Sequence, residues 1–405
     1  MANVIWYISK YVAPPQRASS GSRGFSIMRE LAKLGNTSIV ITSDSNQLAL
    51  VPNFNGKHLI EDVHGVKLIW LRTLKYQTAK SLNRILSWFD FEIRLFFLSK
   101  KDLPKPDVVI ISSLSLLTIF NGLLIRRKYN CKLIFEVRDI WPLTITEEGG
   151  FSESNLFVRL LGVVEKIAYR LSDGIVGTMP NLGEHVTEVL GYSKKTHCIP
   201  MGVESEHIDN VAVLPKEYID NHIPRDKFIV GYAGTIGITN ALDSFFLCAE
   251  KMQHKDEFHF LVVGSGDLKQ FYQDKFKHLN NVSFAPKVAK NLVNSVLTQF
   301  DLLYFSVHDS KVWQYGQSLN KVIDYMLSGK PIVASYSGFP SMINESGCGK
   351  FVPVGDVESM VNVIIEFYTL TPEKRDQIGA RGRRWLIENR NYQRLANNYQ
   401  DVFDS

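Results

Sequence analysis

Cysteine is scarce in this chain of 405 residues, and its four cysteines lie far apart without a C-x-x-C pair. This usage argues against a disulfide scaffold or a cysteine zinc module and fits a reducing compartment. The first residues also lack a basic segment ahead of a long apolar run, so we expect no secretory signal peptide. An apolar fraction of 45% with 21% charged residues is that of a globular protein, which excludes a fibrous or wholly disordered chain.

Charge of one sign is not in large excess, since the formal net charge is only +5. Residues 1–200 hold 25 Lys and Arg against 17 Asp and Glu, whereas residues 201–405 hold 21 against 24. A basic first half suits anionic lipid or a phosphorylated substrate, although chance asymmetry of a solvated surface is the alternative. No basic stripe interleaved with aromatics and no helix-turn-helix or zinc spacing occurs, so we expect no nucleic-acid partner.

Only one uncharged stretch, residues 108–125, is long enough to suggest a membrane span. Its serine, threonine, asparagine and glycine content weakens that interpretation. We instead predict a buried strand at 107–112 followed by a helix at 114–128.

Short apolar runs alternate with amphipathic segments along almost the whole chain, which predicts the α/β class with parallel sheets covered on both faces. The predicted strands are 3–9, 38–43, 66–71, 107–112, 131–137, 173–178 and 196–200, then 227–234, 258–264, 281–285, 301–306, 331–335 and 350–354. The predicted helices include 25–34, 157–170, 182–190, 241–252, 319–327 and 357–368.

The alternation of predicted strands and helices begins again near residue 227, after a long and weakly periodic stretch with prolines. We therefore predict two doubly wound, Rossmann-like domains, at 1–200 and 201–385, with their strand ends facing a cleft. Residues 386–405 are expected to form a helix that packs back on the first domain.

Two glycine turns follow strands of the second domain. The first contains Gly234, Thr235 and Gly237, and the second contains Gly264 and Gly266. Neither is a complete G-x-G-x-x-G, and the following strand offers no acidic ribose ligand, so a dehydrogenase is disfavoured. Two such turns still suit a nucleotide across the strand ends, whereas either alone could be an ordinary tight turn.

The most informative segment is residues 314–334, which reads QYGQSLNKVIDYMLSGKPIVA. Ser318, Asn320 and Lys321 open a predicted helix that ends at Ser-Gly-Lys-Pro before a buried strand. Lys321 and the free N–H groups of the first helical turn would form an anion site. Asp324 follows three residues after Lys321 and would share its face of the helix.

This segment resembles the corresponding helix of retaining family 4 glycosyltransferases with the GT-B fold. Residues 135–142, FEVRDIWP, resemble a motif of the branch that builds bacterial O-antigen and capsule, such as fucosaminyltransferases. Residues 199–203, IPMGV, are similar to the interdomain IPNGV of the family, and both glycine turns also match.

The resemblance implies transfer of a sugar, a 6-deoxy-acetamido hexose, from UDP to a polyprenyl-diphosphate-linked glycan. It implies that the second domain holds the donor and the first meets the acceptor, without a cofactor beyond the UDP-sugar. The implied donor-binding residues are Gly234, Thr235, Gly237, Gly264, Gly266, Lys287, Val288, Ser318, Asn320 and Asp324. The implied acceptor-side residues are Gly21, Arg23 and Glu136, and the implied catalytic residues are Arg138, Asp139 and Lys321.

Two departures from the family pattern affect the charge of the site. Gly316 stands where many members have the first Glu of an E-x7-E pair, and the Arg and Lys common after the first glycine turn are absent. Lys321 would then carry most of the diphosphate charge, assisted by Lys287 or Arg23. No D-x-D occurs in the chain, so the implied reaction is independent of metal.

Arg138 occupies the position at which many members have a histidine that contacts the donor sugar. A guanidinium cannot act as a base, so Arg138 would orient the sugar or contact the diphosphate. Asp139 is then the candidate to meet the acceptor hydroxyl, and a bracing Arg–Asp ion pair is the structural alternative.

A cytoplasmic enzyme follows, with peripheral association at the inner membrane. Residues 80–101 form an aromatic and basic helix that suits a membrane interface or, alternatively, an amphipathic core position. Two other functions stay open: a nucleotide-sugar 2-epimerase of the same fold, and a non-catalytic nucleotide- or glycan-binding module.

Overall fold

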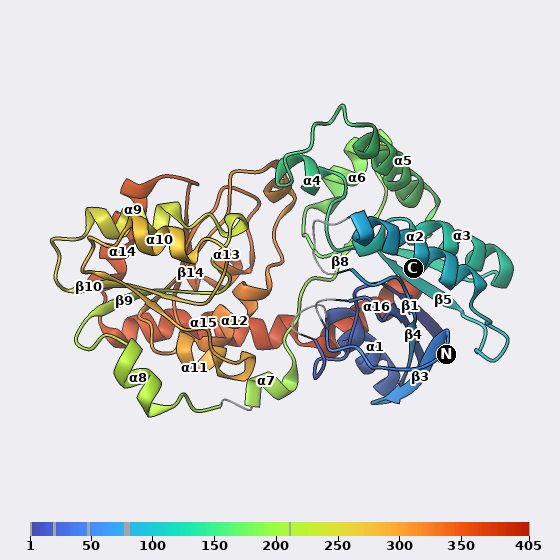
Figure 1. Cartoon of the computed structure of the whole chain (residues 1–405), viewed down its shortest axis with the longest axis horizontal. Helices are drawn as coiled ribbons and strands as arrows, with labels where there is room; N and C mark the ends of the chain where they lie inside the picture. Colours follow the sequence, from blue (N-terminus) through green and yellow to red (C-terminus); the bar gives the residue numbers. More distant parts are fainter. Residues whose placement is uncertain (1, 19–21, 47–48, 77–81, 210–211, 405) are drawn as a thin grey trace. The chain divides into compact units, whose positions relative to one another are not determined.

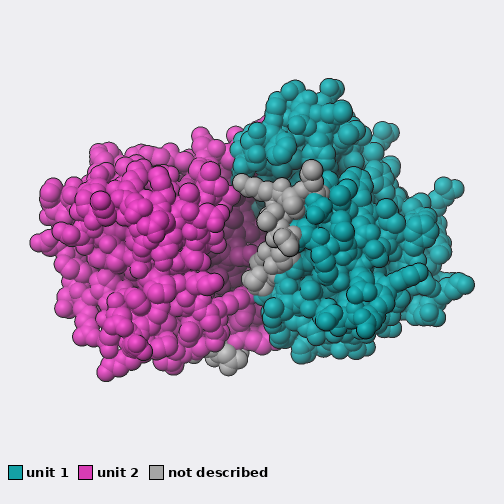
Figure 2. All heavy atoms as spheres, in the orientation of Figure 1, with its two compact units in different colours: residues 1–200, 392–405 teal, residues 201–391 magenta. Residues whose placement is uncertain are grey.

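A computed structural model describes residues 2–18, 22–46, 49–76, 82–209 and 212–404. The chain divides into two compact units (Figure 2). Unit 1 contains Met1–Pro200 and Tyr392–Ser405, and unit 2 contains Met201–Asn391. The sequence analysis placed the return of the chain at residue 386, but a helix continues to Arg390, so the return falls at Tyr392.

Unit 1 is built on an eight-stranded sheet in the order β3-β4-β2-β1-β5-β6-β7-β8 (Figure 1). All its neighbouring strands are parallel except the edge strand β3, which runs antiparallel to β4. The strands are β1 Val4–Ile8, β2 Thr37–Ser43, β3 His58–Val63, β4 Val66–Leu71, β5 Val108–Ser112, β6 Lys132–Val137, β7 Gly174–Gly177 and β8 Thr196–Cys198.

Helices cover both faces of this sheet. They are α1 Arg23–Lys33, α2 Leu82–Phe97, α3 Thr118–Tyr129, α4 Leu143–Glu147, α5 Leu156–Leu171, α6 Leu182–Leu190 and α16 Tyr392–Asp404, with the 3-10 turn η1 Ser113–Ser115. Tyr7 of β1 lies in register with Ile110 of β5, and both belong to the core that α1 and α16 cover. The next residue, Ile111, points to the opposite face, where Gly122 of α3 packs closely on it.

Unit 2 is built on a six-stranded, fully parallel sheet in the order β11-β10-β9-β12-β13-β14. Its strands are β9 Phe228–Ala233, β10 Phe258–Val263, β11 Val282–Ala285, β12 Leu302–Ser306, β13 Ile332–Ser335 and β14 Gly349–Val352. Its helices are α7 Ser205–Asp209, α8 Lys216–His222, α9 Asp243–Lys251, α10 Lys269–Lys275, α11 Val293–Leu297, α12 Asn320–Ser328, α13 Met342–Ser346, α14 Val357–Thr369 and α15 Pro372–Arg390. Three 3-10 turns complete it, η2 Ile238–Asn240, η3 Lys290–Leu292 and η4 Lys311–Tyr315.

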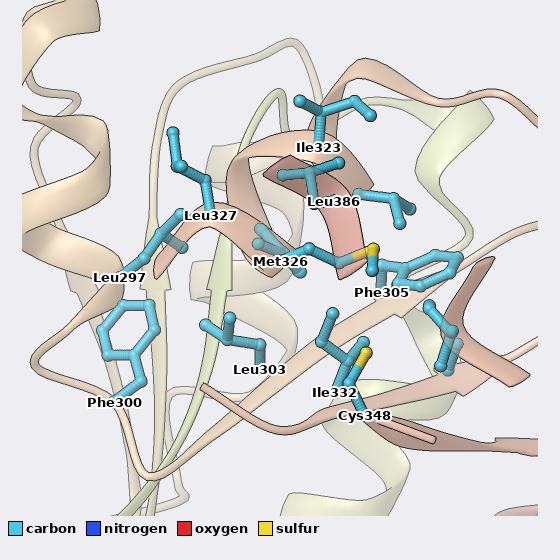
Figure 3. Close-up of a cluster of buried hydrophobic side chains, with 14 of the residues drawn as sticks. Leu297, Phe300, Leu303, Phe305, Ile323, Met326, Leu327, Ile332, Cys348 and Leu386 are labelled. Carbon is cyan, nitrogen blue, oxygen red and sulfur yellow. The ribbon is translucent and has the colours of Figure 1, made fainter. Parts of the chain in front are cut away.

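One hydrophobic core of unit 2 joins α12 and α15 to the sheet (Figure 3). Met326 of α12 lies among Leu303 of β12, Ile332 of β13 and Leu386 of α15, all of which are fully buried. Gly379 of α15 permits this close packing, because a Cβ there would lie 1.9 Å from the carbonyl oxygen of Gly329. The core therefore fixes where α12 begins relative to the strand ends.

The predicted strands are all present, and the uncharged stretch at 108–125 is confirmed as strand β5 followed by α3. No helix within the described residues is long and apolar enough to cross a bilayer. Strand β3 was not predicted from the sequence; its residues alternate between exposed and half-buried at the sheet edge. Nor was most of α15, whose polar composition gives little periodic signal.

Candidate active site

The candidate site of unit 2 lies at the carboxyl end of its sheet. The order β10-β9-β12 means that chain connections depart in opposite directions on either side of β9. Ligands of doubly wound sheets bind at such a switch point, outside the carboxyl ends of the strands. Both glycine turns and the first turn of α12 meet at this end of the sheet.

The two glycine turns pack backbone against backbone. The Gly234 N–H donates to the Val263 carbonyl at 3.0 Å, and the Ile236 N–H donates to the Ser265 carbonyl at 3.0 Å. A Cβ on Gly264 would lie 1.9 Å from the Gly234 carbonyl oxygen, and one on Gly266 would lie 2.2 Å from the Ile236 carbonyl oxygen. Packing between the turns is thus sufficient to require glycine at 264 and 266. Gly237 differs, because a Cβ there would make only an ordinary contact with Thr235.

Lys321, in the first turn of α12, reaches back to the end of β9. Its Nζ donates to the Asn240 side-chain oxygen and lies 3.4 Å from the Tyr232 hydroxyl, 4.9 Å from the centre of that ring. Burial lowers the pKa of Lys321 to about 8. Within the described residues no carboxylate forms an ion pair with it, so its charge is offset only by neutral groups.

Two further residues of α12 face this region. The Tyr325 hydroxyl accepts from the Ala233 N–H at 3.0 Å and lies 3.1 Å from the Tyr304 carbonyl, which ties α12 to β9 and β12. Burial raises the pKa of Asp324 to about 6, and Lys290 offsets part of that shift. A carboxyl with this pKa is mostly ionised at neutral pH and therefore accepts hydrogen bonds.

The other predicted donor residues occupy more varied positions. The Ser318 hydroxyl accepts from the Met201 N–H at 2.8 Å, so this serine already binds the chain where unit 2 begins. Thr235, Lys287 and Asn320 are exposed, whereas Val288 is partly buried against the core.

In unit 1, Arg138 and Asp139 follow the carboxyl end of β6. The Ser113 hydroxyl organises this loop, because it accepts from the Arg138 N–H at 2.9 Å and lies 3.1 Å from the Asp139 carbonyl oxygen. The Thr178 hydroxyl donates to the Arg138 carbonyl at 3.3 Å. Desolvation by the surrounding protein raises the pKa of the Asp139 carboxyl, and Arg138 offsets part of the shift. The residue nevertheless keeps exposed surface.

Arg23 and Glu136 do not lie where the sequence analysis expected them. Both side chains are fully buried and bind each other. Arg23 also donates to the carbonyls of Ile199 and Pro200, the latter at 2.9 Å. Neither side chain can contact an acceptor or a diphosphate directly, because the network uses their polar atoms inside the unit. Gly21, the remaining acceptor-side prediction, lies outside the described residues.

Tyr7 and Tyr399 complete this buried network, since both hydroxyls donate to Glu136, that of Tyr7 at 2.6 Å. Burial alone would raise the pKa of Glu136, but Arg23, Arg138 and the two hydroxyls outweigh it and hold that pKa below its usual range. The carboxylate therefore stays charged and paired, which is a structural arrangement.

The residues that shape these sites and were not predicted from the sequence include Tyr7, Tyr232, Asn240, Ser113 and Tyr399. Asn240 had a usable signal, because it follows closely after the first glycine turn. The others carry no local pattern, since each acts on a residue far away in the chain.

Comparisons with known proteins agree with this architecture. A sucrose-phosphate synthase from Thermosynechococcus elongatus superimposes with a TM-score of 0.71 at 16% identity, covering 99% of this chain and 98% of that one. An E. coli trehalose-6-phosphate structure bound with UDP-2-fluoro glucose gives 0.71 at 12% identity, covering 99% of each chain. Anabaena HepE in complex with UDP and glucose gives 0.63 at 13% identity, covering 100% of each chain. No curated protein matches the sequence.

These likenesses and the two Rossmann-like units define the GT-B fold. Residues 227–369 match the family model of glycosyl transferases group 1, a segment that contains both glycine turns and α12. The chain thus has the GT-B fold, and its residues 227–369 are similar to glycosyl transferases group 1. No group of three or more histidine, cysteine or acidic side chains suited to a metal ion occurs in the described part of the chain.

Proposed function

We propose that this enzyme transfers a sugar, with retention at the anomeric carbon, from a UDP-sugar to a lipid-linked glycan of bacterial surface polysaccharide. The observation that carries the proposal is Lys321, a cation held at the start of α12 without a carboxylate partner among the described residues. A diphosphate is the kind of ligand that this arrangement would stabilise. Structures of similar fold bind UDP with glucose or a fluorinated UDP-glucose, which supports the choice of nucleotide.

In the proposed complex, unit 2 binds the donor. Lys321, Asn320 and the first N–H groups of α12 hold the diphosphate, with the Ser318 hydroxyl beside them. Asp324 accepts from the ribose, and Lys287 and Val288 border the base. The two glycine turns, which pack backbone against backbone at 264 and 266, form the strand ends against which the donor would lie.

During transfer, the bond between the anomeric carbon and the diphosphate oxygen breaks, and the electron pair leaves with UDP. A new bond forms from the acceptor hydroxyl oxygen to the same carbon, and the hydroxyl loses its proton. We assign the proton to Asp139, whose raised pKa favours accepting it, and the orientation of the sugar to Arg138. We take the donor sugar to be a 6-deoxy-acetamido hexose from the resemblance, since Arg138 replaces the histidine that often lies near the 6-hydroxyl of the donor in similar enzymes.

Lys321→Ala tests the assignment of the diphosphate site. We expect turnover to fall by about 100-fold, as for removal of one preorganised transition-state donor. Lys330→Ala is the matched control, because Lys330 lies just beyond the same helix and pairs with the exposed Asp376 at 3.4 Å. Unchanged kinetics in a folded Lys321→Ala protein would remove this residue from the mechanism.

The class of reaction needs a separate measurement. Thermal shifts with UDP, GDP, ADP and NAD identify the nucleotide, and we expect stabilisation by UDP. Product analysis with the UDP-sugar alone should show no epimer. An epimer would support the 2-epimerase, and UDP binding without donor hydrolysis or transfer would support a binding module.

A further inference from the structure

Helix α2 of unit 1 exposes an apolar stripe that its core packing does not explain. Its inward face buries Phe91 and Leu95 completely. Its outward face is also apolar, and every member is at least half exposed, up to 77% for Phe97. These residues are Leu86, Phe89, Ile93, Phe96 and Phe97. The spacing of three and four residues places them on one side of the helix.

Helices α3 and α5 continue this surface. Helix α3 contacts both α2 and α5, and all three lie together in Figure 1. Their exposed apolar residues are Phe120 and Leu124 of α3 with Leu156, Leu160, Val163 and Leu171 of α5. We call the eleven residues of both lists the α2–α3–α5 face. Eleven exposed apolar side chains on three neighbouring helices are typical of an interaction site in a folded protein.

An apolar cavity opens into this face. Its volume is about 230 Å³, and its lining includes Trp88 and Phe89 of α2, Leu117, and Phe157 and Leu160 of α5. Phe89 and Leu160 are themselves half exposed, so the cavity is continuous with the surface. Apolar cavities of about 150 Å³ stay dry and admit benzene, so this one has room for a segment of hydrocarbon chain.

The exposed charges on the three helices themselves are cationic, whereas the exposed Glu147, Glu148 and Glu153 lie in the chain ahead of α5. Helices α2, α3 and α5 contain eight arginines and lysines, of which Arg127, Lys128, Arg159, Lys166 and Arg170 are exposed.

Their three acids are already engaged. Asp90 pairs with Arg94 at 2.7 Å, and Glu165 pairs with His185 at 2.7 Å. Glu92 accepts from Ser115 at 3.1 Å and from Thr118 and Asn121. The outward side of these helices therefore presents cations around an apolar centre.

We propose that the α2–α3–α5 face docks on an anionic lipid bilayer and that the cavity receives a hydrocarbon chain from it. Apolar side chains enter the acyl region while the surrounding cations meet lipid phosphates, the arrangement of interfacial proteins. A second copy of this chain is a poorer occupant, because a two-fold contact would bring the same cations against each other. Docking is a property of unit 1 and does not depend on the proposed transfer reaction.

Co-sedimentation of the full chain with vesicles tests the docking. We expect binding to vesicles of phosphatidylcholine with one-third phosphatidylglycerol, weaker binding to pure phosphatidylcholine, and a loss of binding at high salt. The double substitution Phe96→Ser and Phe97→Ser should reduce binding by at least about tenfold, given the area it removes. Lys166→Gln with Arg170→Gln should weaken binding to the anionic vesicles only.

Phe271→Ser in unit 2 is the matched control, because Phe271 is 50% exposed but lies outside the face. It should bind vesicles as the unmodified protein does. An unchanged melting temperature of every variant without ligand shows that the fold persists, and this readout does not depend on the proposed function.

Brominated acyl chains test the cavity, since Trp88 lines it together with Trp141. We expect the vesicles to quench tryptophan fluorescence and the quenching to shrink in Trp88→Phe with Trp141→Phe. The proposal is overturned if the protein does not bind anionic vesicles or if the Phe96 and Phe97 variant binds them equally. Concentration-dependent dimerisation without lipid, abolished by that same variant, would assign the face to self-association instead.

Discussion

At the scale of single residues, Lys321 acquires its properties from its neighbours. A lysine on an exposed helix would keep its ordinary pKa, but here burial against Tyr232 lowers the pKa to about 8. Asn240 and the Tyr232 hydroxyl hold the ammonium without neutralising it. A buried cation without a counter-ion is costly for stability, and an anionic ligand would relieve that cost.

This environment predicts how the affinity for UDP depends on pH. The free protein loses the Lys321 charge as the pH rises through about 8, and the proposed complex needs the charged form. Affinity should be full below that pH and about tenfold weaker at pH 9 than at pH 7. Isothermal titration calorimetry across this range would measure the change, together with the proton taken up on binding.

Two substitutions control for other titrating groups. Lys321→Arg should keep the affinity and remove the pH dependence, because a guanidinium stays charged. Lys321→Met should bind weakly at every pH. An unaltered pH profile in Lys321→Met would show that another group is responsible.

Arg138 and Asp139 share a loop that Ser113 holds from the neighbouring strand. We expect Asp139→Asn to reduce turnover by about 100-fold or more while the affinity for UDP is kept, because a general base contributes that much. We expect Arg138→His to shift the donor preference from UDP-linked 6-deoxy sugars toward 6-hydroxy sugars.

Steady-state kinetics with both donor types would measure these effects. Wild-type turnover and preference in both variants would favour the alternative in which the pair only braces the loop.

At the scale of elements, one buried network joins four segments of unit 1. Arg23 begins α1, Glu136 belongs to β6, and Tyr7 and Tyr399 come from β1 and α16. Arg23 also binds the carbonyls at 199 and 200, where the chain leaves the unit. The network therefore holds α16 and the end of the unit 1 chain in place.

Glu136→Gln should lower the free energy of unfolding by about 3–5 kcal/mol, because it leaves the Arg23 charge buried without its carboxylate. Glu366→Gln is the matched control: the exposed pair of Lys350 and Glu366 has a similar geometry, at 2.6 Å, and should contribute below about 1 kcal/mol. Denaturant unfolding monitored by fluorescence would compare them. Equal losses in the two variants would show that burial does not strengthen the role of Glu136.

At the scale of the molecule, two units use the same architecture for different chemistry. Each presents its candidate residues at the carboxyl ends of parallel strands, after β6 in unit 1 and after β9 and β10 in unit 2. The unit 2 candidates include the cation and the helix start suited to a diphosphate. The unit 1 candidates include an exposed acid and the apolar face proposed to meet a bilayer.

The whole reaction should not need a divalent metal. Lys321 and the start of α12 would meet the diphosphate charge, and no D-x-D is present in the sequence. We expect turnover to be unchanged after treatment with EDTA. A loss of activity that added magnesium or manganese restores would contradict this prediction and require ligands that the present assignment does not include.

Much of the architecture could be predicted from the sequence, because strands and helices leave periodic patterns of apolar residues. Buried parallel strands appear in a sequence as short continuous apolar runs, as β5 does. The polar residues that follow β5 distinguished this segment from a membrane span. The glycine turns were likewise visible, since small residues are a local requirement, and the periodic apolar residues of α12 placed its start within one residue. The sequence by itself thus determined the class of fold and the segments that could bind a nucleotide.

Only the tertiary structure decided what each charged residue does. From the sequence alone, Arg23 and Glu136 were plausible as exposed contacts of the acceptor. In the structure these two residues, 113 positions apart in the chain, form a buried ion pair. Lys321 meets Asn240, 81 residues away, and Ser318 binds the N–H of Met201, 117 residues away. Burial and distant partners set the pKa of a polar group and decide whether it can still bind a ligand. Neither burial nor a distant partner can be inferred from the residues next to that group. For the same reason the α2–α3–α5 face emerged only with the fold: its apolar residues follow the same helical spacing as core residues, and only packing determines which of them stay in contact with solvent.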